Sequence, residues 1–281
     1  MKTYTIPEKN VNIEADEINI GNNVKFGTDI NIKVRGLFSI GHNSYIGDRF
    51  KANCEQLTIG DYFYNKPTDN GGMNIGGGGS NLPFSRLTIG DRCVCHTGQI
   101  NLARGVEIGN DVGLSHDVDL ITHGFWYSVL QGYPAIFEGI KLGNNVILGW
   151  KSTVMAGVQI TDNVVIGANA TVVKNITASG IYGGTPAKLI RLIEEPTLHE
   201  KIGISSKIVQ EFKELMCFYD AECVIDFQYP VIRINELTVD IEKFTYSGNH
   251  DKVTDAFRDF LRRYGIRIYA PQGFIFNLNR K

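Results

Sequence analysis

A three-residue step recurs along the first two thirds of this chain: an aliphatic residue, then glycine, then Asn, Asp or His. It occurs at Ile20-Gly21-Asn22, Ile40-Gly41-His42, Ile46-Gly47-Asp48, Ile59-Gly60-Asp61, Ile89-Gly90-Asp91, Ile108-Gly109-Asn110 and Leu142-Gly143-Asn144. Aliphatic residues also follow one another at six-residue spacing from Leu142 to Val172. A period of six fits neither an α-helix nor an antiparallel meander. The repeat predicts a coil of short strands, with the aliphatic residues facing inward, in which each strand pairs with its equivalent one coil away.

The distribution of glycine along the chain predicts where this coil ends. Glycine, Asn and Asp tolerate left-handed backbone angles, so we expect the Gly-Asn and Gly-Asp steps to form its corners. Of the 31 glycines, 27 lie in residues 1–190 and only four in the last 91. We therefore predict two domains, 1–191 and 192–281.

Composition excludes several classes of protein. The formal charge is −2, with 28 basic and 30 acidic residues and no run of like charge, so neither nucleic acid nor a membrane surface is an expected partner. No stretch of about 18 apolar residues exists, and the first 20 residues lack the apolar core of a signal peptide, which favours a cytoplasmic location. The five cysteines are odd in number and form no CxxC pair. They predict reduced thiols, with neither a disulfide framework nor a zinc ribbon.

The I-G-x-x-V-x hexads, ending in VVKNITASGIYGGTPAKLIR, resemble the bacterial hexapeptide-repeat acyltransferases of the sugar N- or O-acyltransferase type. The resemblance is strong over about residues 87–191, weaker over 18–64 and absent after about 195. It implies a left-handed parallel β-helix with three-sided coils, a homotrimer, and an acyl-CoA co-substrate bound in a groove between subunits.

The hexad phase breaks at residues 64–86 and 124–139, where we expect loop insertions. After Pro196 the pattern changes. Helical spacing of apolar residues predicts one helix around Ile208, Phe212 and Leu215 and another around Val253, Phe257 and Leu261. Residues 223–246 and the segment IRIYA after Gly265 are rich in β-branched and aromatic residues, which favour strands. These elements predict a small C-terminal α/β domain of unassigned role.

His123, in LITHGFWYS, is the predicted catalytic residue. It stands just before the second insertion, and the resemblance places the family's catalytic histidine there. An imidazole with a pKa near 6.5 can accept a proton from an acceptor and release it to a leaving thiolate. We interpret His123 as a general base; a turn histidine without a role is the alternative.

Residues of the acyl-CoA site also follow from the resemblance. Corner backbone amides that would hold the pantetheine arm align with Gly149-Trp150 and Gly167-Ala168. Amides at such a corner can also stabilise an oxyanion. The basic residues of the tail would meet the phosphates and adenine end of coenzyme A by charge-assisted hydrogen bonds. The predicted donor-binding residues are Gly149, Trp150, Ala168, Lys174, Pro186, Lys188 and Arg191.

The acceptor site is less defined, because the family's acceptor Asn and Asp are replaced by the run RCVCHTGQINLARG. His96, His116 and Asp117 are candidate acceptor contacts, with a structural role at coil corners as the alternative. The glycine-rich run 71–80 lacks a P-loop ending. It suits a flexible insertion, or contact with the phosphates of a nucleotide-linked sugar.

These observations predict transfer of an acyl group from acyl-CoA to a sugar, with the amino group of a nucleotide-linked amino sugar, used for surface glycans, favoured as acceptor. The alternative is O-acetylation of a hydroxyl on a surface polysaccharide or another small acceptor. Two other classes carry less weight: a zinc-dependent γ-class carbonic anhydrase-like enzyme using His96, His116 and His123, and a non-catalytic β-helix scaffold. No bound metal is expected on the leading hypothesis.

Overall fold

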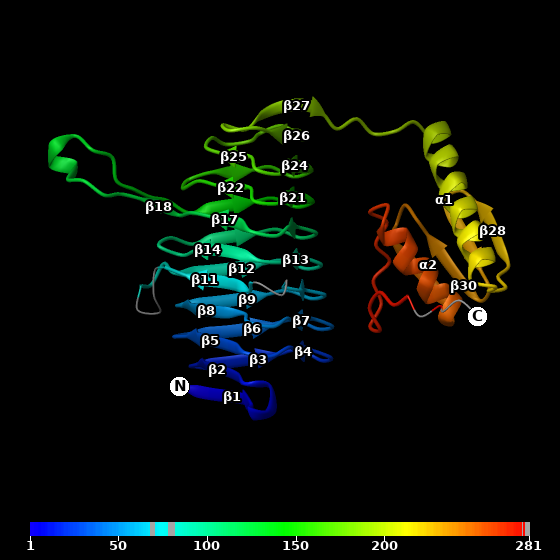
Figure 1. Ribbon diagram of the computed structural model, residues 1–281, viewed down its shortest axis with the longest axis horizontal. Coiled ribbons are helices and arrows are strands. Elements are labelled where there is room, and N and C mark those ends of the chain that lie inside the picture. The colour runs from blue at the N-terminus through cyan, green and yellow to red at the C-terminus, as the bar shows by residue number, and fades with distance from the viewer. Residues whose placement is uncertain (68–70, 78–81, 277, 279–281) are drawn as a thin grey trace. The chain divides into compact units, whose positions relative to one another are not determined.

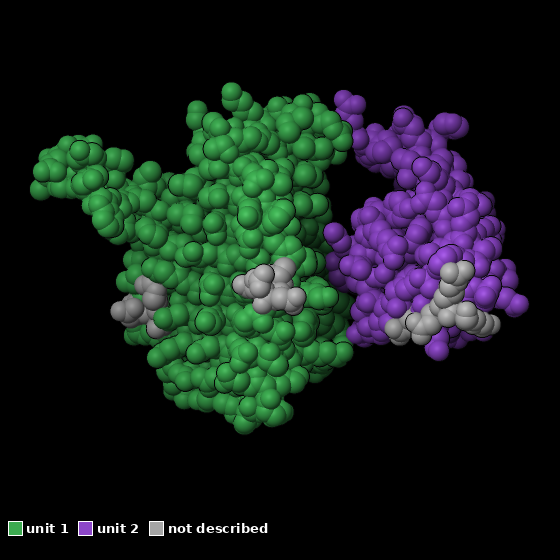
Figure 2. Space-filling view, viewed as in Figure 1, with its two compact units in different colours: residues 1–193 green, residues 194–281 purple. Residues whose placement is uncertain are grey.

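The computed structural model describes residues 1–67, 71–77, 82–276 and 278. It divides into two compact units, residues 1–193 and 194–281 (Figure 2). The boundary lies two residues beyond the one expected from the glycine distribution. Each unit has its own hydrophobic core.

The first unit is a β-helix with three sheets, and each complete coil contributes one strand to each sheet (Figure 1). Successive coils pair in parallel, whereas the first strand of sheet A and the last strand of sheet C pair antiparallel with their neighbours. Sheet A contains β1 (Lys2–Ile6), β2 (Val11–Ala15), β5 (Ile30–Val34), β8 (Lys51–Cys54), β11 (Met73–Gly76), β14 (Gly98–Asn101), β17 (Val118–Leu120), β22 (Thr153–Val154) and β25 (Thr171–Val172). Sheet B contains β3 (Glu17–Ile20), β6 (Leu37–Ile40), β9 (Gln56–Ile59), β12 (Arg86–Ile89), β15 (Val106–Ile108), β20 (Ile140–Leu142) and β23 (Gln159–Ile160). Sheet C contains β4 (Lys25–Phe26), β7 (Tyr45–Ile46), β10 (Tyr64–Asn65), β13 (Val94–Cys95), β16 (Gly113–Leu114), β21 (Val146–Leu148), β24 (Val164–Ile166), β26 (Gly180–Gly183) and β27 (Lys188–Leu192).

The aliphatic repeat lies inside the coils, as predicted. Leu142, Leu148, Val154, Ile160, Ile166 and Val172 are all at most 2% exposed. Because one such residue per side faces inward, the three sheets enclose a continuous apolar core. The predicted fold class, a left-handed parallel β-helix with a small C-terminal domain, is confirmed.

The corners use glycine for a reason different from the one predicted. The glycines of the seven steps do not have left-handed backbone angles; that conformation falls two residues later, for example at Asp111 (φ 57°) and Asn145 (φ 54°). Glycine is required there by close approach instead: a Cβ on Gly109 would lie 2.7 Å from the backbone of Gly143 in the next coil.

The Asn or Asp after such a glycine joins successive coils. The amide of Asn110 donates to Asn144 Oδ1 at 2.8 Å, and the amide of Asn144 donates to Asp162 Oδ1 at 2.7 Å. The same bond joins Asp61 to Asp91 and Asp91 to Asn110. The recurring carboxylate or carboxamide therefore satisfies a corner N–H that no strand can pair.

The two predicted insertions differ in structure. The segment 64–86, expected as one insertion, contains β11, which pairs with β8 and β14 and so supplies a rung of sheet A. Residues 78–80 of the glycine-rich run lie outside the described residues. The segment 124–139 forms an arm that projects from the β-helix (Figure 1), with β18 (His123–Gly124) antiparallel to β19 (Ile136–Phe137) at its base and a 3₁₀ turn, η2 (Val129–Gln131), at its tip. A second 3₁₀ turn, η1 (Pro7–Lys9), lies between β1 and β2.

The second unit combines two helices with an antiparallel sheet. Helix α1 (Leu198–Phe218) begins at a capping box between Thr197 and Glu200, and α2 (Lys252–Arg262) begins at Asp251. Both helices were predicted. The sheet is the meander β28 (Ile225–Gln228), β29 (Val231–Ile234), β30 (Leu237–Asp240) and β31 (Thr245–Gly248).

The strand predicted at IRIYA, residues 266–270, is wrong. This segment has no strand geometry, although Ile268 and Ala270 are buried. The carbonyl of Ile268 accepts hydrogen bonds from the buried guanidinium of Arg258 at 3.0–3.1 Å, so a side chain replaces a strand partner. Over the described part of the chain, neither helix is long and apolar enough to cross a bilayer.

Candidate active site

His123 lies at the corner where the chain leaves sheet A after β17 and enters the arm. The half-buried imidazole places Nδ1 2.8 Å from Oδ1 of Asn101, which ends β14 in the preceding coil. The rings of Phe125 and Phe137 lie beside it, with centroids 5.6 Å and 6.0 Å from that of the imidazole. The arm therefore carries an aromatic wall along one side of the histidine.

The surroundings of Asn101 determine which way its carboxamide points. Asn101 is only 4% exposed, and its Oδ1 also accepts the backbone N–H of Ala103 at 3.2 Å and the hydroxyl of Thr122 at 2.7 Å. An atom that accepts from a backbone N–H must be the carbonyl oxygen, so Nδ1 of His123 is the protonated nitrogen. The lone pair is then on Nε2, which is the arrangement a general base requires.

Asn101 was missed by the sequence analysis. Its signal was a polar residue directly after the buried repeat position Ile100, at the end of a strand and next to a coil corner. Many corner residues of this chain are Asn or Asp, so the signal alone did not separate Asn101 from the structural ones.

Three of the predicted donor residues, Gly149, Trp150 and Ala168, lie at a different corner, where the chain passes from sheet C to sheet A. Trp150 precedes β22 and Ala168 precedes β25, one coil apart. The N–H of Gly149 donates to Ile166 O at 2.8 Å, and that of Gly167 to Tyr182 O at 2.8 Å, so these two glycine amides are committed to the coil itself. Among the described residues, the N–H groups of Trp150 and Ala168 have no such partner and remain available to a ligand.

The three candidate acceptor residues lie at the corner of Trp150 and not at that of His123. Asp117 Oδ2 accepts from Trp150 Nε1 at 3.2 Å, and its Oδ1 accepts from the Thr97 hydroxyl at 3.0 Å. Both hydrogen bonds lower the pKa of Asp117, and the bond from Thr97 has the larger effect. The rings of His96 and His116 stack at 4.3 Å, and burial together with His96 lowers the pKa of His116.

The basic tail residues lie at the last coils. Lys188 and Arg191 are exposed on β27, which pairs antiparallel with β26 at the end of sheet C. Lys174 is exposed after β25, and Pro186 follows a cis peptide bond. None of the three cations forms an ion pair with a described carboxylate. Their charges are open to an anionic ligand.

Two further kinds of reactive group in the described residues are the buried thiols and the candidate metal ligands. Burial raises the pKa of Cys54 to about 12 and of Cys93 to about 11, and also raises that of Cys95, so these sulfurs stay protonated and weakly nucleophilic. In the part of the chain that the structure covers, no three His, Cys, Asp or Glu side chains converge as a metal site. His96 and His116 stack together, whereas His123 is bonded to Asn101.

No protein-family profile matches the chain. It is 45% identical over 93 residues to Protein CapG of Staphylococcus aureus, a match that covers 32% of this chain and 54% of that protein. The chain is similar to hexapeptide-repeat acetyltransferases. It spans about half the length of the curated relative it matches.

Solved structures with related folds include three acyltransferases. A hexapeptide-repeat acetyltransferase from Vibrio cholerae is 15% identical over 63% of this chain and 74% of its own, with a TM-score of 0.35. The polysialic acid O-acetyltransferase OatWY is 19% identical over 68% and 98% of the two chains, with a TM-score of 0.44. A variant of the N-acyltransferase AntD from Bacillus cereus, in complex with dTDP and coenzyme A, is 17% identical over 75% and 100%, with a TM-score of 0.40. Similarity at this distance does not transfer a substrate.

Proposed function

We propose that this chain is an acyl-CoA-dependent acyltransferase that acylates a sugar, with His123 as the general base. The amino group of a nucleotide-linked amino sugar is the acceptor we favour. A sugar hydroxyl is the alternative, and the same base would serve it. One observation carries the proposal: Nδ1 of His123 lies 2.8 Å from Asn101 Oδ1. Because a carboxamide oxygen can only accept a hydrogen bond, this contact assigns the proton to Nδ1 and the lone pair to Nε2.

The donor would bind along the corner of Trp150 and Ala168. Their two available amides suit the pantetheine arm or the thioester oxygen, and each such donor is commonly worth about 3 kcal/mol to the transition state. Lys174, Lys188 and Arg191 supply charge for the phosphates, and Pro186 lies in the turn between β26 and β27.

This site would need more than one chain, because the two corners lie at opposite ends of the strands of sheet A. His123 follows β17, whereas Trp150 precedes β22, the neighbouring strand. At about 3.3 Å per residue, the strand and its flanking residues separate them by roughly 15–20 Å. A cyclic homotrimer would bring the His123 corner of one copy to the donor corner of the next and give three shared sites.

In the reaction, the acceptor nitrogen or oxygen attacks the thioester carbonyl carbon while Nε2 of His123 removes its proton. Corner amides stabilise the oxyanion that forms. Collapse of this intermediate breaks the C–S bond, and His123 returns the proton to the departing thiolate. The products are the acylated sugar and free coenzyme A, with no covalent enzyme intermediate.

The test is release of free thiol from acetyl-CoA with a panel of nucleotide-linked amino sugars, neutral sugars and glycans. His123→Ala should lower kcat/KM by about 10²- to 10⁴-fold. His199→Ala, which changes an exposed histidine of α1, is the control and should leave turnover unchanged. Equal turnover by His123→Ala and the unmodified protein would refute the assignment of the base.

A further inference from the structure

Arg104 is held beside the His123 corner in an unusual setting for an arginine. Its guanidinium carbon lies 3.9 Å from the ring centroid of Phe84 and 5.6 Å from that of Phe137. One N–H donates to the carbonyl of Ala103 at 3.0 Å. No described carboxylate lies within ion-pair distance of it, although the side chain is half-buried. Most of its five N–H donors are therefore free to meet a ligand.

Arg104 is linked to His123 through both backbone and side chains. Its backbone N–H donates to Thr122 Oγ1 at 3.1 Å, and Thr122 in turn donates to Asn101 Oδ1, which bonds His123. On the arm, Phe137 contacts both the guanidinium and the imidazole. One connected group of residues therefore sets the positions of both the Arg104 guanidinium and the His123 imidazole.

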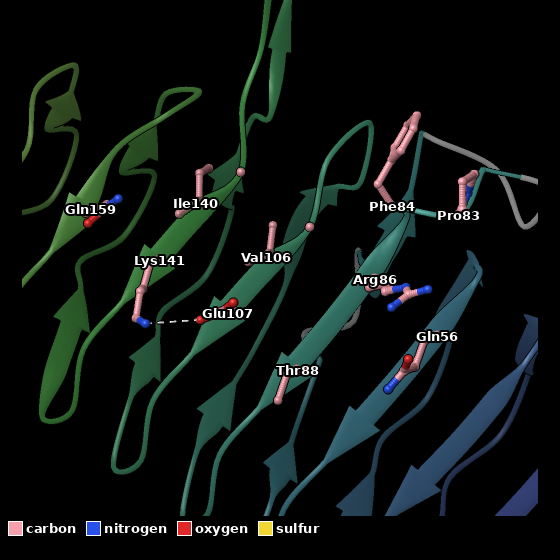
Figure 3. A pocket seen from close by; sticks show the side chains of 12 residues that line it. Gln56, Pro83, Phe84, Arg86, Thr88, Val106, Glu107, Ile140, Lys141 and Gln159 are labelled. Atoms are coloured by element: carbon pink, nitrogen blue, oxygen red, sulfur yellow. Dashed lines mark ion pairs between the residues drawn. The ribbon is translucent and has the colours of Figure 1, made fainter.

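Phe84 also lines an open groove of about 800 Å³ on the outer face of sheet B (Figure 3). The groove reaches Gly139 and Ile140, where the arm returns to the β-helix, so one end of it lies at the base of the arm that carries His123. On its floor Lys141 and Glu107 neutralise each other at 3.2 Å, as the dashed line in Figure 3 marks. A chain lying in this groove would contact Phe84, the ring on which Arg104 stacks.

We propose that Arg104 binds an oxyanion of the acceptor, a carboxylate or a phosphate, next to the group that His123 deprotonates. This inference rests on the proposed function and narrows its substrate class to acidic or phosphate-linked sugars. A planar guanidinium fork suits both oxyanions, because two parallel N–H groups can meet two oxygens. Stacking on Phe84 fixes the fork and removes it partly from water, which strengthens a charged hydrogen bond.

The acceptor is the ligand to expect here, because the donor cations Lys188 and Arg191 lie on sheet C beyond a different corner. Arg104 would act as a positioning and specificity residue, without a part in proton transfer. Arg35 offers a matched control: it is an exposed arginine at the same sheet A to sheet B corner, several coils closer to the N-terminus.

The experiment measures equilibrium binding of two probes, UDP and D-glucuronate, by calorimetry or ligand-observed NMR, with the full-length protein saturated with coenzyme A. At least one probe should bind, and Arg104→Gln should weaken it by tenfold or more. Arg104→Lys should recover part of the loss, and Arg35→Gln should change binding less than twofold. UDP binding would identify a nucleotide-linked acceptor, and glucuronate binding an acidic sugar.

The proposal is overturned if neither probe binds, or if Arg104→Gln binds both as tightly as the unmodified protein. Its failure can be distinguished from failure of the proposed function, because coenzyme A binding and the loss of thiol release in His123→Ala are measured separately. Thermal unfolding of Arg104→Gln checks that the β-helix is intact. A variant that unfolds early is replaced by Arg104→Met, which retains the apolar stem over Phe84.

Discussion

Asn101 lies 22 residues before His123, yet its Oδ1 atom is 2.8 Å from Nδ1 of the imidazole. Removing this acceptor frees the ring to take the other tautomer and to rotate. Asn101→Ala should therefore lower kcat by about 10- to 100-fold, as loss of an orienting partner does, while the KM for acyl-CoA stays the same. Asn53→Ala, which changes an exposed Asn of sheet A, should have no effect. Equal losses in the two variants would contradict the orienting role.

The cations that we propose for the donor site give a prediction with the opposite kinetic signature. Lys188→Ala combined with Arg191→Ala should raise the KM for acyl-CoA by about tenfold or more and leave kcat nearly unchanged, because phosphate contacts bind substrate and transition state equally. Lys207→Ala, on the exposed face of α1, is the control. Steady-state rates at several acyl-CoA concentrations separate KM from kcat. A fall in kcat with no change in KM would show that these cations do not bind acyl-CoA.

His116 predicts a pH dependence of stability. Burial, with a smaller contribution from His96, lowers its pKa below the usual 6.5 in the folded protein. The unfolded chain therefore binds more protons near pH 6.5, so His116 favours the folded state fully above that pH and progressively less as the pH falls towards its folded pKa. His116→Gln should reduce the fall in Tm between pH 7.5 and 5.5 by only about 1–2 °C, because the His116 side chain is only partly buried.

The matched control for this pH effect is His199→Gln on α1, where the histidine is exposed. Scanning calorimetry of the three proteins at both pH values measures the difference. A pH dependence that is identical in all three would show that His116 keeps its ordinary affinity for protons.

Two glycines predict stability changes of opposite sign. A Cβ at Gly109 would lie 2.7 Å from backbone atoms of Gly143, so Gly109→Ala should destabilise the β-helix by about 1–3 kcal/mol. Gly203 lies within α1 with nothing within 4 Å of its added Cβ, so Gly203→Ala should stabilise the second unit by about 0.5–1 kcal/mol. Urea unfolding followed by circular dichroism measures both. Destabilisation by Gly203→Ala would mean that this face of α1 is covered.

The sequence predicted the elements that a periodic pattern marks and missed those that no period marks. The inward positions from Leu142 to Val172 follow from spacing, because one residue in each hexad must face the core. The helices around Phe212 and Phe257 follow from their apolar periodicity for the same reason. The rung at Met73–Gly76 was missed, since the loops on either side of it break the hexad phase.

Local sequence determined where the corners lie, but contacts between coils decided why glycine stands there. The left-handed residue of the corner is Asp111 or Asn145, while Gly109 is needed because Gly143 of the next coil comes so close. Such a requirement involves residues 34 positions apart, and no local pattern contains it.

By itself, the sequence determined the coil, its core and the position of His123 at the second break in the repeat. The tertiary structure decided which residues act together. Asn101 is hydrogen-bonded to His123, and Arg104 stacks on Phe84 beside them. The candidate acceptor residues lie instead at the corner of Trp150; they are His96, His116 and Asp117. The physical reason is that a β-helix stacks residues of successive coils above one another at each corner. Which residues become neighbours therefore depends on the number of residues in each coil, including any insertion.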